Sequence, residues 1–275
     1  MKIKNLFLMA VIALSGVGCG SSVFYQVYNV KSVSGDAVNS NLLKFEDDNC
    51  RVSYNLWGEY GNMEFRIYNK TDENIYLDMS ESFFIINNEA HDYFQNRVFS
   101  KSANQGVATK KTVAVSKTSP GLFQINQHIM VSSGSSAVST GYSVSSVEKR
   151  VVCIPVKSSK LFSEFKINNT VLRDCDLLRF PKRKEIAPKA YDLSDSPLVF
   201  SNRFLYTIGN SIEPVNLENK FYVSEITNYP QEEMFDTDYE EFCGEKSFSK
   251  STYNKYVSPK RFFIQYSKGM EDWKH

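Results

Sequence analysis

The stretch that decides the fold class is NMEFRIYNKTDENIYLDMSESFFII, residues 62–86. In its first part, Met63, Phe65 and Ile67 are separated by single residues of other types. This period of two places the three side chains on one face of a β-strand. The segment 69–72 then has the residue types of a hairpin turn, and further strand-like runs follow it. The stretch therefore predicts antiparallel β structure.

Similar runs, separated by turns rich in Asn, Ser and Gly, continue on both sides of this stretch. They cover residues 23–30, 51–57, 74–78, 82–86, 150–156, 162–167, 198–207, 220–227 and 261–266. Asn87-Asn88 is expected to turn the chain into a run that ends at Phe94, because Asn tolerates positive φ. Asn168-Asn169 is expected to turn it back through residues 170–172. Leu122–Met130 is the best candidate for a short helix.

Two polar stretches, 100–117 and 131–146, interrupt the strand pattern, and the second has low complexity typical of a surface loop. The charged segment PKRKE, residues 181–185, is the candidate boundary. We therefore expect a mainly β, antiparallel domain over residues 23–180 and a β-rich C-terminal extension over residues 181–275.

Composition limits the classes of function. The 275 residues include 32 Lys+Arg and 31 Asp+Glu, a formal net charge of +1, which argues against a nucleic-acid-binding protein. The hydrophobic fraction of 42% is near that of globular proteins. Lys182-Arg183-Lys184 is too short for a nucleic-acid patch and is interpreted as a charged linker.

The N-terminus reads MKIKNLFLMAVIALSGVGCGSS. A basic start followed by an apolar stretch from Leu6 to Val17 is typical of a secretory signal peptide, expected over residues 1–18. The small residues before Cys19 resemble a bacterial lipoprotein signal, although Gly16 stands where that pattern usually has Leu. The resemblance implies that Cys19 is lipidated, and residues 19–22 would then tether the protein to a membrane.

Two further resemblances concern the body of the chain. The segments 69–72, 83–85 and 154–158 follow an order that resembles immunoglobulin-like sandwiches of bacterial lipoproteins. NKTDENIYLDMSESFFI (residues 69–85) and NKFYVSEITNYP (residues 219–230) together resemble uncharacterised exported lipoproteins of Bacteroides-type bacteria. The resemblance implies export, anchoring and an immunoglobulin-like β-sandwich for residues 23–180, and it provides no catalytic residues.

The cysteines other than Cys19 are Cys50, Cys153, Cys175 and Cys243. They contain no Cys-x-x-Cys spacing, so a zinc site is not expected, and no cofactor is expected. In an exported chain they could form disulfides, and Cys153 with Cys175 is the pair to test because it flanks the expected turn at 168–169. The alternative is buried, free thiols.

Catalytic patterns are weak. His91, His128 and His275 are scattered, and no Gly-x-Ser-x-Gly motif accompanies them, so no catalytic residue is assigned and an enzyme is not expected. A hydrolase would need His91 or His128 beside an acid and a nucleophile. The acidic run 232–241 could hold Ca²⁺ but fails the EF-hand pattern, and a solvated acidic loop is the favoured interpretation.

These observations favour a non-enzymatic cell-envelope lipoprotein with a binding or scaffolding role. It would be exported, anchored to the membrane through Cys19, placed at the outer membrane or facing the periplasm, and would contact an envelope protein or a glycan. The alternative is a carbohydrate-binding or adhesive module, in which exposed aromatic side chains stack on sugars. The candidates for such a platform are Tyr25, Tyr28, Tyr54, Tyr60, Tyr68 and Tyr76.

Overall fold

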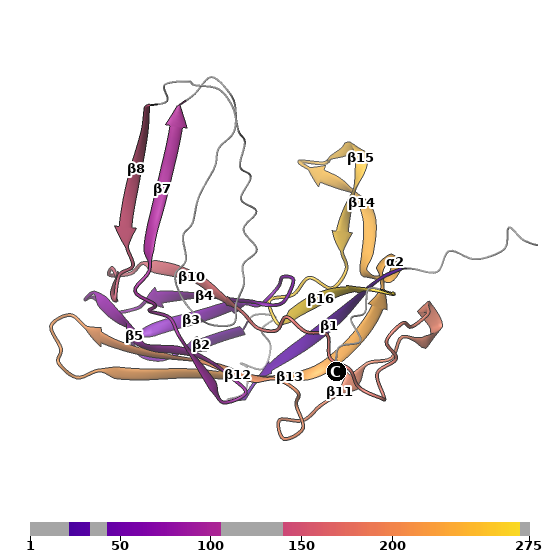
Figure 1. Cartoon of the computed structure of the whole chain (residues 1–275), viewed down its shortest axis with the longest axis horizontal. Helices are drawn as coiled ribbons and strands as arrows, with labels where there is room; N and C mark the ends of the chain where they lie inside the picture. Colours follow the sequence, from indigo (N-terminus) through magenta and orange to yellow (C-terminus); the bar gives the residue numbers. More distant parts are fainter. Residues whose placement is uncertain (1–21, 34–42, 106–139, 270–275) are drawn as a thin grey trace, which may run out of the picture.

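The computed structural model describes residues 22–33, 43–105 and 140–269 of the chain. Its fold is mainly β, and the strands pair in antiparallel fashion (Figure 1). Two sheets form a sandwich-like body, and the larger sheet curls into a half-barrel. The prediction of a mainly β, antiparallel sandwich is confirmed.

The larger sheet is eight-stranded. Its path runs β16 (Arg261–Ser267), β1 (Val23–Ser32), β13 (Val215–Pro230), β12 (Val199–Ile208), β5 (Ile75–Ile86) and β6 (Glu89–Asp92), with β11 (Lys189–Ala190) on β13 and β9 (Val151–Ile154) on β5. The smaller sheet has the order β10 (Ser159–Lys166), β4 (Asn62–Asn69), β3 (Cys50–Asn55) and β2 (Leu43–Glu46).

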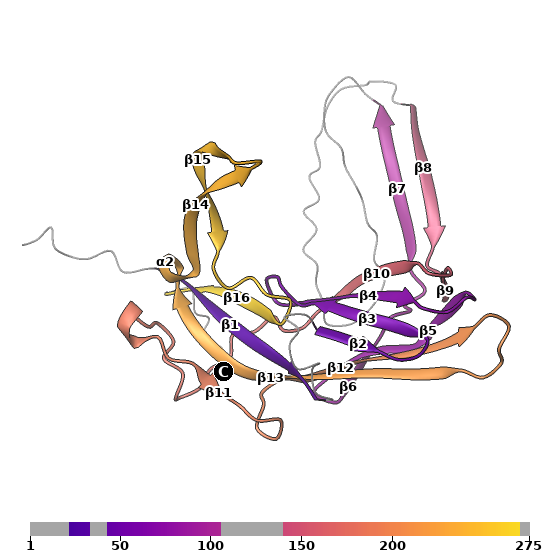
Figure 2. The same cartoon turned by 180° about the vertical axis from the view of Figure 1, so that it is seen from behind.

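Two hairpins form separate two-stranded sheets, and the helices are short. The hairpins are β7 (Val98–Gln105) with β8 (Thr140–Val147), and β14 (Phe235–Phe242) with β15 (Glu245–Asn254). The helices are the 3₁₀ turn η1 (Arg183–Glu185) and α2 (Gln231–Met234). We call the two hairpins the β7–β8 arm and the β14–β15 arm, because both rise from the same side of the body in two opposite views (Figure 2).

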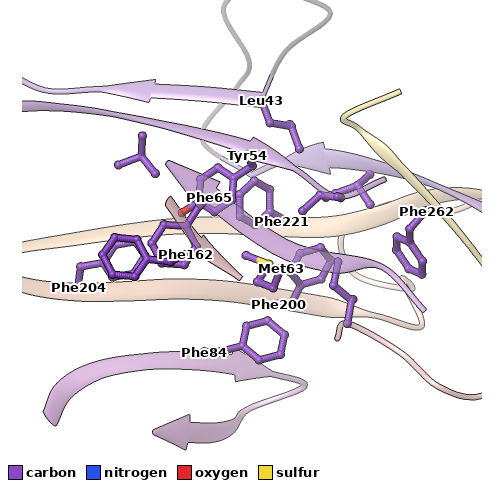
Figure 3. Close-up of a cluster of buried hydrophobic side chains, with 14 of the residues drawn as sticks. Leu43, Tyr54, Met63, Phe65, Phe84, Phe162, Phe200, Phe204, Phe221 and Phe262 are labelled. Carbon is purple, nitrogen blue, oxygen red and sulfur yellow. The ribbon is translucent and has the colours of Figure 1, made fainter. Parts of the chain in front are cut away.

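The core lies between the two sheets and is rich in aromatic rings (Figure 3). On β4, Met63, Phe65 and Ile67 are all buried, which confirms the face predicted from their period of two. The Phe65 ring lies 4.8 Å from that of Phe204, and the Tyr54 ring lies 4.8 Å from that of Phe221, centroid to centroid. Each pair joins the two sheets. Full burial of one such side chain contributes about 1.5–3 kcal/mol.

Hydrogen bonds between buried polar side chains also span the core. The Tyr54 hydroxyl donates a hydrogen bond of 2.8 Å to Asn219 Oδ1, and the Tyr93 hydroxyl donates one of 2.7 Å to Asn202 Oδ1. Asn202 and Asn219 are opposite each other in the β12–β13 ladder. Burial raises the pKa of both tyrosines, so their hydroxyls stay protonated and act as donors.

The C-terminal part is β-rich, as expected, but it shares the sheet of the N-terminal part. Strand β13 pairs with β1 along one edge and with β12 along the other, and β12 in turn pairs with β5. Strands from both sides of residues 181–185 are therefore combined in one sheet and line one core. The charged segment at 181–185 lies in a connection that includes η1.

Three turns test the expectations drawn from Asn-rich segments. Asn87 and Asn88, at φ of 47° and 70°, form the two-residue loop of the β5–β6 hairpin, so that prediction is confirmed. The prediction of a hairpin turn at 69–72 is wrong, because the strands on either side of it, β4 and β5, belong to different sheets. Buried Asn69 instead fixes this crossing, donating from Nδ2 to the carbonyls of Glu73 (2.7 Å) and Ile154 (3.1 Å).

The predicted return strand at 170–172 was also wrong. The buried Gln26 amide pairs with the backbone of Leu172, accepting from its N–H at 2.7 Å and donating to its carbonyl at 3.1 Å. The Gln26 side chain thus satisfies the hydrogen-bonding groups of the Leu172 backbone that a neighbouring strand would otherwise pair with. Residues 170–172 therefore follow an irregular path. The described ends of the two polar stretches are strands, Val98–Gln105 and Thr140–Val147, so the loop expected over 131–146 is wrong for residues 140–146. Residues 106–117 and 131–139 lie outside the described residues.

Candidate functional site

The two arms are the parts of the described chain most exposed beyond the packed body (Figure 2). On β14, every residue from Asp236 to Phe242 is exposed. Phe242 and Phe248 are 82% and 109% exposed, whereas eight other phenylalanines of the described residues are buried. Large exposed apolar side chains are typical of contact surfaces when they gather. The β14–β15 arm is therefore the first candidate binding site.

The base of the β14–β15 arm packs against the body, whereas strand β14 beyond the base is exposed. Met234 of α2 is fully buried against Tyr25 and Val27 of β1. The rings of Tyr25 and Phe235 meet at 5.5 Å, nearly perpendicular. At the far end, Cys243 and Gly244 have φ of 53° and 84°, the positive values that a tight two-residue hairpin loop needs. The arm is thus fixed at its base and closed by local turn chemistry.

The β14–β15 arm carries the acidic run. Asp236, Asp238, Glu240 and Glu241 are exposed along β14. On β15, Lys250 lies over the Tyr239 ring at 5.5 Å from its centroid, which holds these two exposed side chains together. The sequence favoured a solvated loop for this run. Residues 236–241 are exposed as expected, but Met234 is buried, and the run forms the end of α2 and most of strand β14.

An ion-pair network holds the base of the β7–β8 arm. Arg97 Nε donates to Glu148 Oε1 at 2.8 Å, and Arg97 Nη1 donates to Glu164 Oε2 of β10 at 2.9 Å. Glu148 Oε2 also accepts the backbone N–H groups of Gln95 (2.9 Å) and Arg97 (3.0 Å). Burial would raise the pKa of Glu148, but these hydrogen bonds outweigh it and lower that pKa. The carboxylate therefore stays charged and ties the arm to the smaller sheet.

A groove of about 390 Å³ crosses the solvent-facing side of the smaller sheet. Lys44, Ser53, Arg66 and Leu161 line it and are opposite one another across the four strands in the register. Arg66 Nη1 donates to Ser159 Oγ at 3.2 Å. The lining combines cationic, hydroxyl and apolar groups with the carboxylate of Glu64, so it could take an extended polar ligand.

The six tyrosines considered for sugar stacking do not form one exposed row. Tyr25, Tyr28 and Tyr54 are buried, and Tyr60 and Tyr76 are partly exposed. Tyr68 is partly exposed on the smaller sheet, where the Arg51 guanidinium lies over its ring at 5.9 Å. Aromatic side chains of this chain therefore serve mainly the core.

Cys50, Cys153, Cys175 and Cys243 are free thiols in the structure. The pair expected from the sequence is thus not formed: Cys153 is exposed on β9, and Cys175 is exposed in the irregular segment after β10. The hairpin that was expected to bring them together is absent. Burial raises the pKa of the Cys50 thiol to about 12, which makes it unreactive in the folded state.

Of the histidines considered for catalysis, the structure describes His91. His91 lies on β6, with its ring 6.1 Å from Phe84 and 6.2 Å from Phe165 between centroids. Within the described ranges, no group of three or more His, Cys, Asp or Glu side chains is arranged to hold a metal ion. Cys19, the signal peptide, the expected helix at 122–130, His128 and His275 lie outside the described residues.

Among the described helices, none combines the length and hydropathy that a membrane span requires. Comparisons of the chain with protein-family models, with curated proteins and with solved structures found no match.

Sequence reasoning found neither arm. The signal for the β14–β15 arm was present, because strand residues such as Tyr239 and Phe242 lie within the acidic run and Cys243-Gly244 suits a tight turn. It was missed because the side chains of β14 have no buried face that would produce an apolar alternation.

Proposed function

We propose that the protein is a non-enzymatic cell-envelope lipoprotein that acts by binding or scaffolding a partner. The observation that carries the binding role is the exposed β14–β15 arm, which presents apolar side chains outside the core. The N-terminal sequence supports the anchor: an apolar signal stretch is followed by small residues and Cys19. The resemblance to exported lipoproteins supports a place at the outer membrane or facing the periplasm.

Metabolic labelling tests the anchor. Cells that express the wild type, Cys19→Ser or Cys243→Ser are fed labelled palmitate, and the membranes are then fractionated. We expect label and membrane association in the wild type and in Cys243→Ser, which removes an exposed cysteine elsewhere, and loss of both in Cys19→Ser. An unlabelled wild type that does not sediment with membranes would refute the lipoprotein proposal.

The second candidate is a carbohydrate-binding or adhesive module, favoured by the groove on the smaller sheet. Its row of Lys44, Ser53, Arg66 and Leu161 offers donors for hydroxyl and carboxylate groups beside an apolar surface. A glycan array probed with the wild type and with Arg66→Ala tests it. Binding to acidic glycans that weakens in Arg66→Ala would support this candidate, and an array without signal would count against it.

A further inference from the structure

The edges of the β14–β15 arm are open. Strands β14 and β15 pair with each other, and neither pairs with a third strand in the described part of the chain. An open strand edge offers backbone N–H and C=O groups to an added strand. The eight residues of β14 are long enough to pair with a short extended peptide.

Apolar side chains lie beside these edges. Phe242 and Phe248 are almost fully exposed near the turn of the arm, and Tyr239 and Tyr253 are 44% and 48% exposed along it. These side chains lose contact with water only if another molecule covers them. They would give an added strand apolar contacts beyond its backbone hydrogen bonds.

The charge along β14 indicates what covers the β14 edge of the arm, whereas β15 carries Lys246 opposite Glu241 and Lys250 opposite Tyr239. Asp236, Asp238, Glu240 and Glu241 are exposed on β14, and none of these carboxylates is in an ion pair within the described ranges. By contrast, Glu233 in α2 pairs with Arg183 at 3.1 Å. Opposite charges on neighbouring strands stabilise a sheet, whereas like charges weaken it. The side chains of an added strand would therefore be cationic.

The position of the arm bears on where this strand comes from, and this step rests on the proposed lipidation of Cys19. Phe24 pairs with Pro230, the residue before α2, so the start of β1 lies beside the base of the arm. From Cys19 to Ser22 an extended chain spans about 10 Å. A lipidated Cys19 would thus hold the base of the arm close to the membrane surface. Anionic lipids would repel the carboxylates of β14, which favours a protein partner over the bilayer itself.

We infer that the β14–β15 arm is a docking surface for an extended, Lys- or Arg-bearing segment of another envelope protein, which adds as a strand along β14. The carboxylates of β14 select the cationic side chains, and the exposed phenylalanines contact the apolar ones. The groove of the smaller sheet takes no part in this interaction.

A designed peptide tests the inference. The full chain, purified in detergent, is titrated into a fluorescent eight-residue peptide of alternating Val and Lys, and anisotropy reports binding. We expect the Lys peptide to bind, and a Val–Glu peptide of equal length to bind at least about tenfold more weakly. Methylation of alternate backbone nitrogens in the Lys peptide should abolish binding, because it removes the donors of an added strand.

Matched variants locate the site. Asp236→Asn/Asp238→Asn/Glu240→Gln/Glu241→Gln should weaken binding by about tenfold or more. The control Asp48→Asn/Glu81→Gln/Glu89→Gln/Glu213→Gln removes the same number of exposed carboxylates from the body and should bind like the wild type. Both are expected to keep the far-UV circular dichroism and the melting temperature of the wild type, because these side chains lie outside the core.

Each contrary result overturns the inference. Failure of the Lys peptide to bind, equal binding of both peptides, or equal loss in the control variant would remove the arm as a cationic docking surface. Sedimentation with vesicles of phosphatidylethanolamine and phosphatidylglycerol that is lost in Phe242→Ser/Phe248→Ser would assign the arm to the bilayer instead. Because the peptide assay does not depend on acylation, failure of the palmitate experiment would leave this result standing.

Discussion

Strands β4 and β14 are both eight residues long, yet they are stabilised in different ways. On β4, Met63, Phe65 and Ile67 face a second sheet and are buried. On β14, Tyr239 and Phe242 face solvent, and the strand depends on its turn and on β15. The comparison teaches that apolar residues in a strand indicate a core only where another layer covers them. Elsewhere they indicate a surface that another molecule can cover.

The strongest test of this comparison is to truncate one phenylalanine in each region. Phe65→Ala removes a ring in contact with those of Phe204 and Phe162, and should lower the free energy of unfolding by about 3–5 kcal/mol. Phe248→Ala on the arm should change it by less than about 0.5 kcal/mol. Urea denaturation of both variants measures the difference. Similar losses would mean that the arm shares the stability of the body.

Removing one hydroxyl group tests the contribution of the hydrogen bonds in the core. Tyr54→Phe leaves Asn219 Oδ1 buried without its donor, so we expect a loss of about 1–3 kcal/mol. Tyr253→Phe, on the exposed arm, is the matched change and should leave the unfolding midpoint where it is. If Tyr54→Phe is as stable as the wild type, the hydroxyl does not contribute as the structure suggests.

The base of the β7–β8 arm should respond to pH. The folded pKa of Glu148 is lowered, so its contribution is present above the unfolded pKa and is lost as the pH falls through the folded value. Glu148→Gln should therefore cost about 1–2 kcal/mol at pH 7 and almost nothing near pH 2. Stability measured by urea denaturation at both pH values gives this difference. A cost that does not depend on pH would contradict the ionic contribution.

The smallest effect on stability is expected for modification of the exposed thiols. Cys243 at the tip of the arm should react with a thiol reagent at pH 8 at least about a hundredfold faster than Cys50, whose buried thiol has a raised pKa. Labelled peptides, identified by mass spectrometry over time, report each rate. Fast reaction of Cys50 without unfolding would show that β3 opens locally.

What the sequence could predict also differs between the packed body and the exposed arm. The alternation around Phe65 and the Asn87-Asn88 turn were local signals, and they led to the right face and the right hairpin. The crossing at Asn69 and the irregular path at Leu172 depend on buried side chains from distant strands, which no local pattern reveals. Strand β14 lacks a buried face, so periodicity could not find it.

The pairing of β1 has a consequence for the order of events in folding. Its partners are the last strands of the chain: Val23 pairs with Ser267, and Phe24 pairs with Pro230. At about 5–20 residues per second, β1 emerges roughly 10–50 s before β16 is synthesised. Until β13 and then β16 follow, the apolar residues of β1 have neither of their partner strands, and such long-range pairing closes slowly. The larger sheet is therefore completed only after β16 has been synthesised, late in the described part of the chain.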